Sequence, residues 1–375
     1  MRAVIFDSIR SEPRVREVPE PIAPDDGVVV RVMATGMCRS DWHAWAGHDE
    51  ITLPHVPGHE LAGVISAVGP AVTRWRPGDR VTVPFVCGCG RCAWCRSGQA
   101  QVCPDQQQPG FTHWGSFAGS VALHAADTNL VALPPAVDFA AAAALGCRFA
   151  TAYRALAGRA RVTAGEWVTV IGAGGVGLSA VMIARALGAR VIAVDRHPAA
   201  LAVAAELGAD QTLLAAGTNT GGTDTRGTDT RGPDTGGSST RGPDTGCTDI
   251  PAAVAELTGG GSHVSVDAVG SEQTCADAIL SLRRRGRHVQ IGLLPPVDGH
   301  PRVPMARVIG WELDVLGSHG MAAVDYPEMM ALIEQGRLEP QRLIERTIGL
   351  AEAAALLPGF DQATVAGMTM VDPAR

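Results

Sequence analysis

The first third of the chain alternates short β-prone runs with turns, and no long helical period appears in residues 1–35. Residues 3–6 and 28–33 are β-prone runs, and a proline-rich segment, 19–24, lies between them. Residues 63–69 and 80–84 continue the pattern, with a Pro-Gly-Asp turn separating them. Short apolar runs bounded by turn residues are typical of strands. The pattern therefore predicts a β-rich first domain.

A different pattern begins at residue 167, where apolar strands alternate with segments of helical spacing. Residues 168–171 form a buried run that leads into a glycine-rich turn, and 178–187 continue with helical apolar spacing. Strands alternating with helices predict an α/β domain with a doubly wound parallel sheet of six strands. The further strands are expected at 190–194, 210–214, 263–269, 287–291 and 313–316, with one helix at 251–257 and another ending at Arg285.

The stretch 167–184 carries no charged residue and is just long enough to raise the question of a membrane span. Its glycines cluster as a turn, however, and Arg185 follows directly. A buried strand, a turn and a helix therefore explain this stretch better than a span does.

Residues 218–247 interrupt the alternation between the third strand and its helix. They fall into pentads such as Thr-Asp-Thr-Arg-Gly at 223–227 and 228–232, and no large apolar residue occurs before Ile250. Such a segment cannot offset the entropy of ordering. The sequence therefore predicts a disordered surface loop at the edge of the sheet.

Length, charge and the N-terminal residues exclude several classes of protein. A chain of 375 residues with 46% hydrophobic content favours two domains over one. A net charge of −7 provides no basic field for phosphate backbones, so no nucleic-acid partner is expected. The first seven residues include Arg2 and Asp7 and hold no apolar signal-peptide core. We therefore expect a cytoplasmic protein without a membrane partner.

Nine cysteines in such a chain indicate metal or catalytic thiols over disulfides. Four of them are spaced C-x2-C-x2-C-x7-C, which can close a tetrahedral Zn²⁺ site with no open position. An iron–sulfur cluster is the alternative, since this run also ends in Cys-Pro, but the x7 gap disfavours it. Cys87 has no assigned partner and is a spare thiol that could compete for metal. The expected structural zinc ligands are Cys89, Cys92, Cys95 and Cys103.

A second candidate metal site begins in residues 38–60. This stretch holds the thiol of Cys38, the imidazole of His59 and the carboxylates of Asp41 and Glu60, a mixed set that Zn²⁺ accepts. We interpret it as half of a catalytic metal site. A third ligand must come from elsewhere in the chain, and Cys147 fits that requirement.

A candidate dinucleotide site follows the buried strand that ends at residue 171. Its turn reads Gly-Ala-Gly-Gly-Val-Gly, and the next strand ends in Asp195 at the distance typical of a βαβ unit. A carboxylate there accepts hydrogen bonds from ribose hydroxyls and repels a 2′-phosphate, which favours NAD over NADP. Arg196 would favour NADP instead, because an arginine could accommodate the 2′-phosphate. The turn residues expected to bind the cofactor are Gly172, Gly174, Gly175, Val176 and Gly177.

Two motifs carry a resemblance to a known family. Gly58-His59-Glu60, followed by Gly63, Gly69 and Val72, resembles the zinc signature of the zinc-dependent medium-chain alcohol dehydrogenases. Residues 38–41 with His43 resemble the other metal-proximal motif of that family, and 145–151 resemble the segment that supplies its second thiolate. The similarity covers nearly the whole chain apart from the inserted segment.

The resemblance implies a fold of two domains with the active site between them. A GroES-like β-rich catalytic domain would take residues 1–148 and 318–375, since the C-terminal tail returns to the first domain. A Rossmann NAD-binding domain would take residues 149–317. Within this second domain, residues 218–247 form an insertion that the family lacks.

The resemblance also implies roles for single residues. Cys38, His59 and Cys147 would hold the catalytic zinc with an open fourth position, and Glu60 would be an alternate ligand. Asp41 would accept a hydrogen bond from His59. The proton relay would run through Ser40 to His43, and Arg39 would pair with the cofactor pyrophosphate. Residues expected to line the nicotinamide are Thr151, Val269, Ile291 and Leu293.

The expected function is therefore reversible hydride transfer between a small primary or secondary alcohol and NAD, with two zinc ions per subunit in a homodimer or homotetramer. Alternatives are a polyol or amino-alcohol dehydrogenase, an NADP-linked aldehyde reductase, and a zinc- and NAD-holding scaffold without turnover. The scaffold needs neither Ser40 nor His43. Candidate walls of the substrate pocket are Trp45, Phe85, Trp114 and Phe117.

Overall fold

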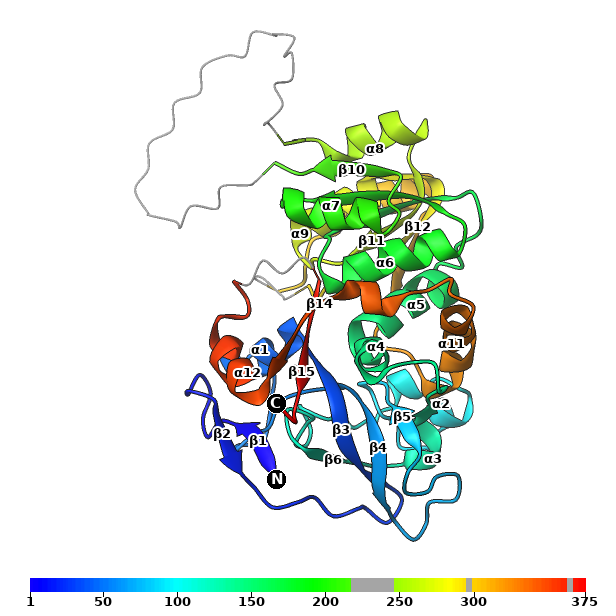
Figure 1. Ribbon diagram of the computed structural model, residues 1–375. Coiled ribbons are helices and arrows are strands. Elements are labelled where there is room, and N and C mark those ends of the chain that lie inside the picture. The colour runs from blue at the N-terminus through cyan, green and yellow to red at the C-terminus, as the bar shows by residue number, and fades with distance from the viewer. Residues whose placement is uncertain (217–245, 295–298, 363–366) are drawn as a thin grey trace.

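The computed structural model describes residues 1–216, 246–294, 299–362 and 367–375. Two bodies are visible in Figure 1, one built on a mixed sheet and carrying both chain ends, the other built on a parallel sheet. The chain crosses between them through a continuous helical segment. It consists of α4 (Phe139–Ala144), η2 (Leu145–Phe149), α5 (Ala150–Tyr153) and η3 (Arg154–Arg159).

A seven-stranded sheet forms the centre of the first body, in the order β14-β15-β3-β4-β5-β7 with β6 beside β3. Strands β3 and β4 are antiparallel, and their register places Glu60 opposite Gly36. This confirms the predicted β-rich first domain. The strands are β3 (Val28–Met37), β4 (Glu60–Val68), β5 (Arg80–Thr82), β6 (Ser120–Leu123), β7 (Val131–Ala132), β14 (Ile344–Gly349) and β15 (Met368–Asp372), and β1 (Arg2–Ile5) pairs separately with β2 (Arg14–Glu17).

Strand β3 is buried over most of its length, and the face that carries its even-numbered residues is buried throughout. Val28, Val30 and Val32 lie on that face and pack with Leu61 and Ile65 of β4. The helices of this body are short. They are α1 (Arg39–Ala46), α2 (Ala93–Arg96), α3 (Ala126–Asn129) and α12 (Leu350–Leu356), with 3-10 turns η1 (Ala100–Val102) and η6 (Leu357–Gly359).

The C-terminal segment pairs with the first body. Strand β15 runs antiparallel to β3, with Thr369 opposite Met37, and β14 runs parallel to β15. Both chain ends therefore lie in the same body (Figure 1). The predicted domain border at 148/149 falls inside the helical segment 139–159, so the division of the chain into 1–148, 149–317 and 318–375 stays a prediction.

The second body holds the predicted doubly wound sheet, in the order β10-β9-β8-β11-β12-β13 with every pair parallel. This confirms the predicted fold class. The strands are β8 (Trp167–Ile171), β9 (Arg190–Asp195), β10 (Gln211–Leu214), β11 (Ser262–Asp267), β12 (Leu282–Gln290) and β13 (Asp314–Gly317); the helices are α6 (Gly175–Ala186), α7 (Pro198–Glu206), α8 (Ile250–Thr258), α9 (Glu272–Leu280) and α10 (Met305–Trp311). After β13, the chain forms η4 (Ala323–Asp325), α11 (Tyr326–Glu334) and η5 (Pro340–Leu343) beside the helical segment 139–159 (Figure 1), where the hydroxyl of Tyr326 donates to the carbonyl of Leu145.

The prediction of a helix reaching Arg285 is wrong. Helix α9 ends at Leu280 and β12 already begins at Leu282. Leu282 continues the helical spacing of the buried residues Cys275 and Ile279, but it reaches the same hydrophobic cluster from a strand. The register of β11 with β12 shifts between its first two pairs, so residues 283–286 bulge out of the ladder.

The residues 217–245 lie outside the described part of the chain, and so does the prediction of disorder for them. Gly246 and Cys247, which the prediction included in the loop, are described. Cys247 forms a parallel bridge with Ala215, and its N–H donates to the carbonyl of Leu214 at 2.7 Å. The prediction of disorder therefore does not hold for Cys247, which pairs beside the end of β10.

The apolar stretch 167–184 forms β8, a turn and most of α6, as predicted. Both elements are buried in the core of the second body. Among the helices within the described residues, none is both long and apolar enough to cross a membrane.

Candidate metal and cofactor site

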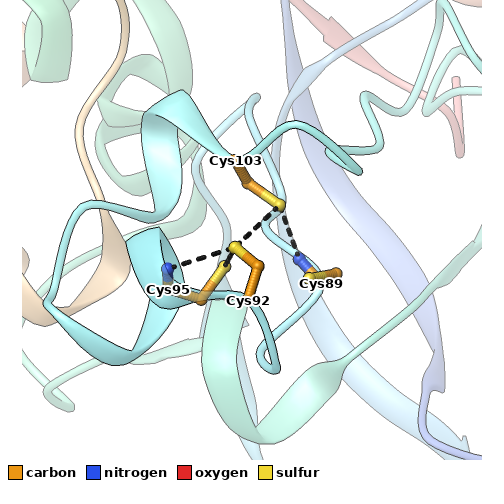
Figure 2. A group of neighbouring side chains, drawn as sticks. All are labelled: Cys89, Cys92, Cys95 and Cys103. Carbon is orange, nitrogen blue, oxygen red and sulfur yellow. Dashed lines mark hydrogen bonds between the residues drawn. The ribbon is translucent and has the colours of Figure 1, made fainter.

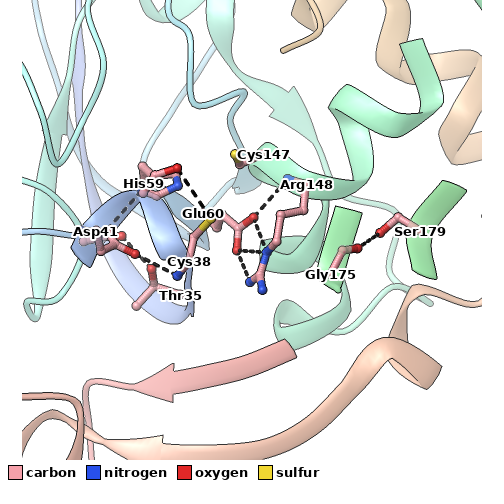
Figure 3. A network of polar contacts seen from close by, with 12 residues as sticks. Thr35, Cys38, Asp41, His59, Glu60, Cys147, Arg148, Gly175 and Ser179 are labelled. Carbon is pink, nitrogen blue, oxygen red and sulfur yellow. Dashed lines mark hydrogen bonds and ion pairs between the residues drawn. The ribbon is translucent and has the colours of Figure 1, made fainter. Parts of the chain in front are cut away.

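Four donor groups from distant parts of the chain converge at the junction of the two bodies (Figure 3). Cys38 precedes α1, His59 and Glu60 lie at the start of β4, and Cys147 lies in η2. Their sulfur, nitrogen and oxygen atoms all lie within 4.8 Å of one another. Two thiols and one imidazole are the donors that Zn²⁺ accepts at a catalytic site with an open position.

Asp41 orients both the imidazole of His59 and the backbone at Cys38. Its carboxylate accepts hydrogen bonds from the N–H of Cys38 at 2.8 Å, the N–H of Gly58 at 3.0 Å and Nδ1 of His59 at 3.0 Å. With Nδ1 donating to Asp41, Nε2 is the ring nitrogen left to bind another group. This Nε2 is buried and has no hydrogen-bond partner among the described residues. A buried acceptor left open in this way fits a metal ion.

The contact between the two thiols of this cluster shifts their pKa values in opposite directions. A hydrogen bond with Cys147, followed by contacts with His59 and the charge of Arg148, outweighs burial and lowers the pKa of Cys38 well below its ordinary value. The same hydrogen bond and burial raise the pKa of Cys147. A divalent cation would remove this competition, since both sulfurs bind metal as thiolates.

Glu60 faces an arginine as well as the metal donors. Arg148 donates from its backbone N–H and from Nε to Oε1 of Glu60, each at 3.0 Å, and its Nη2 also binds Oε2. The Glu60 side chain is fully buried and that of Arg148 is 8% exposed. Sequence analysis assigns no role to Arg148, although it directly follows Cys147.

The second donor group is the cysteine quartet, which lies on one loop around α2 (Figure 2). Cys92 caps α2, and its sulfur accepts from the N–H of Cys95 at 3.4 Å. Its sulfur also lies 3.5 Å from that of Cys95 and 3.7 Å from that of Cys103. A tetrahedral zinc with bonds of about 2.3 Å requires sulfurs separated by about 3.8 Å. The quartet, completed by Cys89, therefore has the dimensions of a closed zinc site.

Cys87 lies apart from this group. Its thiol is buried and donates to the carbonyl of Pro84 at 3.4 Å. Burial raises the pKa of Cys87 to about 12, so this residue stays a thiol at neutral pH. The described donor group contains the other four cysteines of the segment, without Cys87.

Two residues of the predicted proton relay lie on one face of α1. The hydroxyl of Ser40 is 3.7 Å from the sulfur of Cys38, and His43 follows one turn later. Nδ1 of His43 lies 2.8 Å from Nδ1 of the exposed His48. Burial, then the neighbouring His48, lowers the pKa of His43. Sequence reasoning missed His48, whose separation of five residues matches no helical motif and follows from the left-handed turn at Gly47.

The predicted cofactor turn lies between β8 and α6. Gly172 has a φ of 94°, and a Cβ there would lie 2.6 Å from the side chain of Val269. A Cβ at Gly177 would collide with the carbonyl of Gly172, whereas Gly174 faces open space. Asp195, at the end of β9, accepts a hydrogen bond from the N–H of Ala173 at 2.7 Å. The turn can thus admit a pyrophosphate close to its backbone.

Among the remaining predicted cofactor residues, Thr151 lies beside the metal donors, whereas most of the others lie at the carboxyl edge of the six-stranded sheet. The hydroxyl of Thr151 donates to the carbonyl of Cys147 at 2.7 Å, which keeps it beside the metal donors. Val269 is 51% exposed and Leu293 is 70% exposed, and both follow the carboxyl ends of neighbouring strands, as does the half-buried Ile291. Val176, in the first turn of α6, and the exposed Arg196, directly after β9, lie at the same edge. Arg39 lies in α1 of the first body, where it donates to the carbonyl of Asp361 at 2.8 Å.

The aromatic residues expected to wall the substrate pocket are only partly near the metal donors. The ring of Phe85 lies 6.0 Å from that of His59. Phe117 is fully buried in a core cluster against which Trp45 also packs, so these two are packing residues. Trp114 is partly exposed, and its indole N–H donates to the carbonyl of Pro54.

Two further rings that sequence reasoning missed lie beside His59 and Phe85. Phe111 has its ring centre 5.0 Å from that of His59, and His319 lies 5.1 Å from Phe85. Both lie on loops, where no periodicity marks which residues point inward.

Comparisons with known proteins agree with these features. The family described as "Alcohol dehydrogenase GroES-like domain" matches residues 24–135, and "Zinc-binding dehydrogenase" matches 175–234 and 240–335. An alcohol dehydrogenase of Geobacillus stearothermophilus is 39% identical over 216 residues, which are 56% of this chain and 62% of that protein. That match spans less than two thirds of the relative's length.

Two further relatives cover almost the whole chain. An alcohol dehydrogenase of Moraxella sp. (strain TAE123) is 29% identical over 93% of this chain and all of that protein. The solved structure of an NAD-dependent alcohol dehydrogenase is 29% identical, covers 99% of each chain and superposes with a TM-score of 0.81. The chain belongs to the zinc-dependent medium-chain alcohol dehydrogenase family.

Proposed function

We propose that this chain is an NAD-linked, zinc-dependent alcohol dehydrogenase that interconverts a small primary or secondary alcohol with its aldehyde or ketone. The observation that carries the proposal is the convergence of Cys38, His59 and Cys147 within 4.8 Å, with Nε2 of His59 buried and open. The glycine turn of a dinucleotide site lies across from this cluster. The metal site and the cofactor site that a hydride transfer requires thus both lie at the junction of the two bodies.

Each cofactor has a defined task in this proposal. Zinc supplies a Lewis acid that lowers the pKa of a substrate hydroxyl, and NAD supplies the hydride acceptor. Cys38, His59 and Cys147 would hold the catalytic zinc, and the cysteine quartet would hold the structural one. The buried ring of Phe85 and the partly buried ring of Phe111, both beside His59, limit the space to small alcohols and exclude water from their carbon chain.

The substrate proton leaves along α1. Ser40 accepts it first, because its hydroxyl lies beside Cys38, and His43 takes it one helical turn further on. With NAD bound, Ser40 and His43 would hold the two ends of this path. The contact of His43 with the exposed His48 then offers an exit to solvent. The lowered pKa of His43 keeps its imidazole neutral, and therefore able to accept a proton, at neutral pH.

NAD is favoured over NADP because of Asp195. Its two oxygens accept backbone hydrogen bonds from Ala173 and His197, which fix the carboxylate at the mouth of the turn. A 2′-phosphate placed there would meet this negative charge, whereas ribose hydroxyls can donate to it. Arg196 bonds to His197 and not to the turn.

We propose a homodimer or homotetramer as the assembly. Strand β13 is an open edge of the six-stranded sheet, with Val315 45% exposed. Ile309 and Met305 of the neighbouring α10 are 73% and 51% exposed, which adds apolar surface beside that edge. All nine cysteines are free thiols, which fits a reducing compartment, so we place the protein in the cytoplasm.

Steady-state assays with NAD and NADP against short primary, secondary and aromatic alcohols test the proposal directly. We expect turnover with NAD and a small alcohol, lower catalytic efficiency with NADP, and two zinc ions per chain by elemental analysis. Polyols or amino-alcohols as the preferred substrates would support the alternative dehydrogenase, and a preference for aldehydes with NADPH would support the reductase. Binding of NAD without turnover on any of them would contradict an enzyme function.

A further inference from the structure

Arg148 connects the two halves of the site, and the proposal below rests on the function proposed above. One side of its guanidinium holds Glu60 through Nε and Nη2 (Figure 3). The other side lies against the start of α6, where a Cβ built on Gly175 would be 2.8 Å from Cδ and 3.1 Å from Nη1 of Arg148. The side chain therefore spans from the metal donors to the glycine turn.

The glycines around Arg148 are explained by this contact. Gly175 occupies a position of the turn that the dinucleotide motif leaves free, yet any side chain there would strike Arg148. A Cβ on Gly36, opposite Glu60 in the sheet, would collide with Oε2 of Glu60 and lie 3.1 Å from Nη2 of Arg148. Residues of β3 and α6 thus both leave room for the same ion pair.

One side-chain nitrogen of Arg148, Nη1, remains able to donate a hydrogen bond to a ligand. Its backbone N–H, Nε and Nη2 all bind Glu60, whereas Nη1 makes no hydrogen bond to any described residue. Nη1 is the nitrogen nearest Gly175, where the helix N-terminus would receive a pyrophosphate. A cationic donor at that place suits an anionic oxygen.

The charge balance at the metal donors also depends on Arg148. Cys38 and Cys147 as thiolates, with Glu60, place three negative charges in a buried space, and one guanidinium with a divalent ion compensates them. Since Arg148 binds Glu60 through three nitrogens, it restrains a carboxylate that is otherwise close enough to be a metal ligand. Loss of Arg148 would leave that carboxylate buried without its partner.

We propose that Arg148 is a positioning residue that couples cofactor binding to the metal site: its Nη1 binds the pyrophosphate of NAD, while its Nε and Nη2 hold Glu60 away from the metal. NAD bound at the turn fixes the guanidinium, and the guanidinium fixes Glu60. Cofactor occupancy therefore makes the catalytic zinc harder to remove.

The test measures NAD affinity by protein fluorescence and the rate at which a chelator removes the catalytic zinc, with and without saturating NAD. The variants are Arg148→Gln, Arg148→Lys and Glu60→Gln. Arg154→Gln is the matched control, because Arg154 is also a partly buried arginine of the same helical segment but pairs with Asp325, away from the turn. Thermal melting establishes that each variant is folded.

We expect Arg148→Gln to weaken NAD binding at least fivefold and to abolish the protection of zinc by NAD. Arg148→Lys keeps the charge and should retain NAD affinity within about threefold, but it should lose most of the protection, since lysine cannot hold both oxygens of Glu60. Glu60→Gln should keep NAD affinity within threefold and lose the protection. The Arg154→Gln control should match the unmodified protein in both measurements.

Unchanged NAD affinity and unchanged zinc protection in Arg148→Gln would overturn the coupling. If Arg148→Gln does not fold, the same outcome in Arg148→Lys overturns it. Failure of the unmodified protein to bind NAD at all contradicts the proposed function instead, so the two failures are distinguishable.

Discussion

The cysteine quartet takes its four donors from one loop, residues 89–103, whereas the catalytic cluster takes its donors from three segments far apart in the chain. The quartet has no room for a substrate, because its four sulfurs already complete a tetrahedron. The catalytic cluster has two sulfurs, one open imidazole nitrogen and a carboxylate that is engaged by Arg148. Local donors thus make a closed site that holds a loop, and distant donors make an open site that exists only in the folded chain.

This difference predicts that the two sites respond differently to the loss of one ligand. Removing a ligand of the open site should abolish activity and leave the fold, while removing a ligand of the closed site should weaken the fold first. The following variants can break or sharpen that contrast.

Cys147→Ala should have the largest effect. The metal would lose one of two thiolates, so we expect kcat/KM to fall by about a thousandfold or more and zinc content to drop from two ions to one per chain. The melting temperature should change little, because the quartet is intact. Elemental analysis and steady-state kinetics measure both quantities, and retention of two zinc ions would contradict the assignment of this ligand.

Cys103→Ala should mainly lower stability. Without the quartet zinc we expect the free energy of unfolding to fall by about 3 kcal/mol or more, with kcat of the folded fraction within about threefold of the unmodified protein. Thermal and denaturant unfolding report this change. Cys87→Ala is the matched control, because its buried thiol donates to Pro84, and it should keep two zinc ions. Zinc loss in that control would show that Cys87 belongs to the metal site.

Asp41→Asn should weaken the open site without removing a ligand. The carboxylate accepts three hydrogen bonds and fixes the tautomer of His59, so we expect a 10- to 100-fold loss of catalytic zinc affinity. Competition with a chromophoric chelator measures this affinity, and the quartet zinc serves as the internal control. Equal zinc affinity in the variant would mean that Asp41 does not orient His59.

His43→Gln should have the smallest effect. The pKa of His43 is lowered by burial and by His48, so its imidazole is neutral and accepts protons above a pH somewhat below its ordinary value. Alcohol oxidation by the unmodified protein should therefore rise as the pH increases through that pKa and then level off. In the variant, this rise of activity with pH should disappear and kcat should fall by about tenfold, with both zinc ions retained. An unchanged pH profile would remove His43 from the relay.

Much of the fold was predictable because its signals are local. The spacing of Cys89, Cys92, Cys95 and Cys103 and the strand-turn-helix around Gly172 are contiguous patterns with a direct physical meaning. The end of α9 was not predictable, because Leu282 continues the helical spacing while the chain has already entered a strand. The bulge at 283–286 depends on pairing with β11, which periodicity does not contain.

The residues of the candidate site were also predictable only in part. Motif resemblance pointed to Cys38, His59 and Cys147, and the structure brings these three together. It gave no indication of the ion pair between Arg148 and Glu60, because the partners meet only through the packing of η2 on β4. Single aromatic residues were the weakest predictions: Phe117 packs in the core, while Phe111, on a loop, lies beside His59.

Anomalous diffraction at the zinc absorption edge, from crystals of the unmodified protein, tests the central claim most directly. Two peaks per chain are expected, one inside the cysteine quartet and one between the sulfurs of Cys38 and Cys147 and Nε2 of His59. A single peak, confined to the quartet in fully active enzyme, would contradict the catalytic site described here.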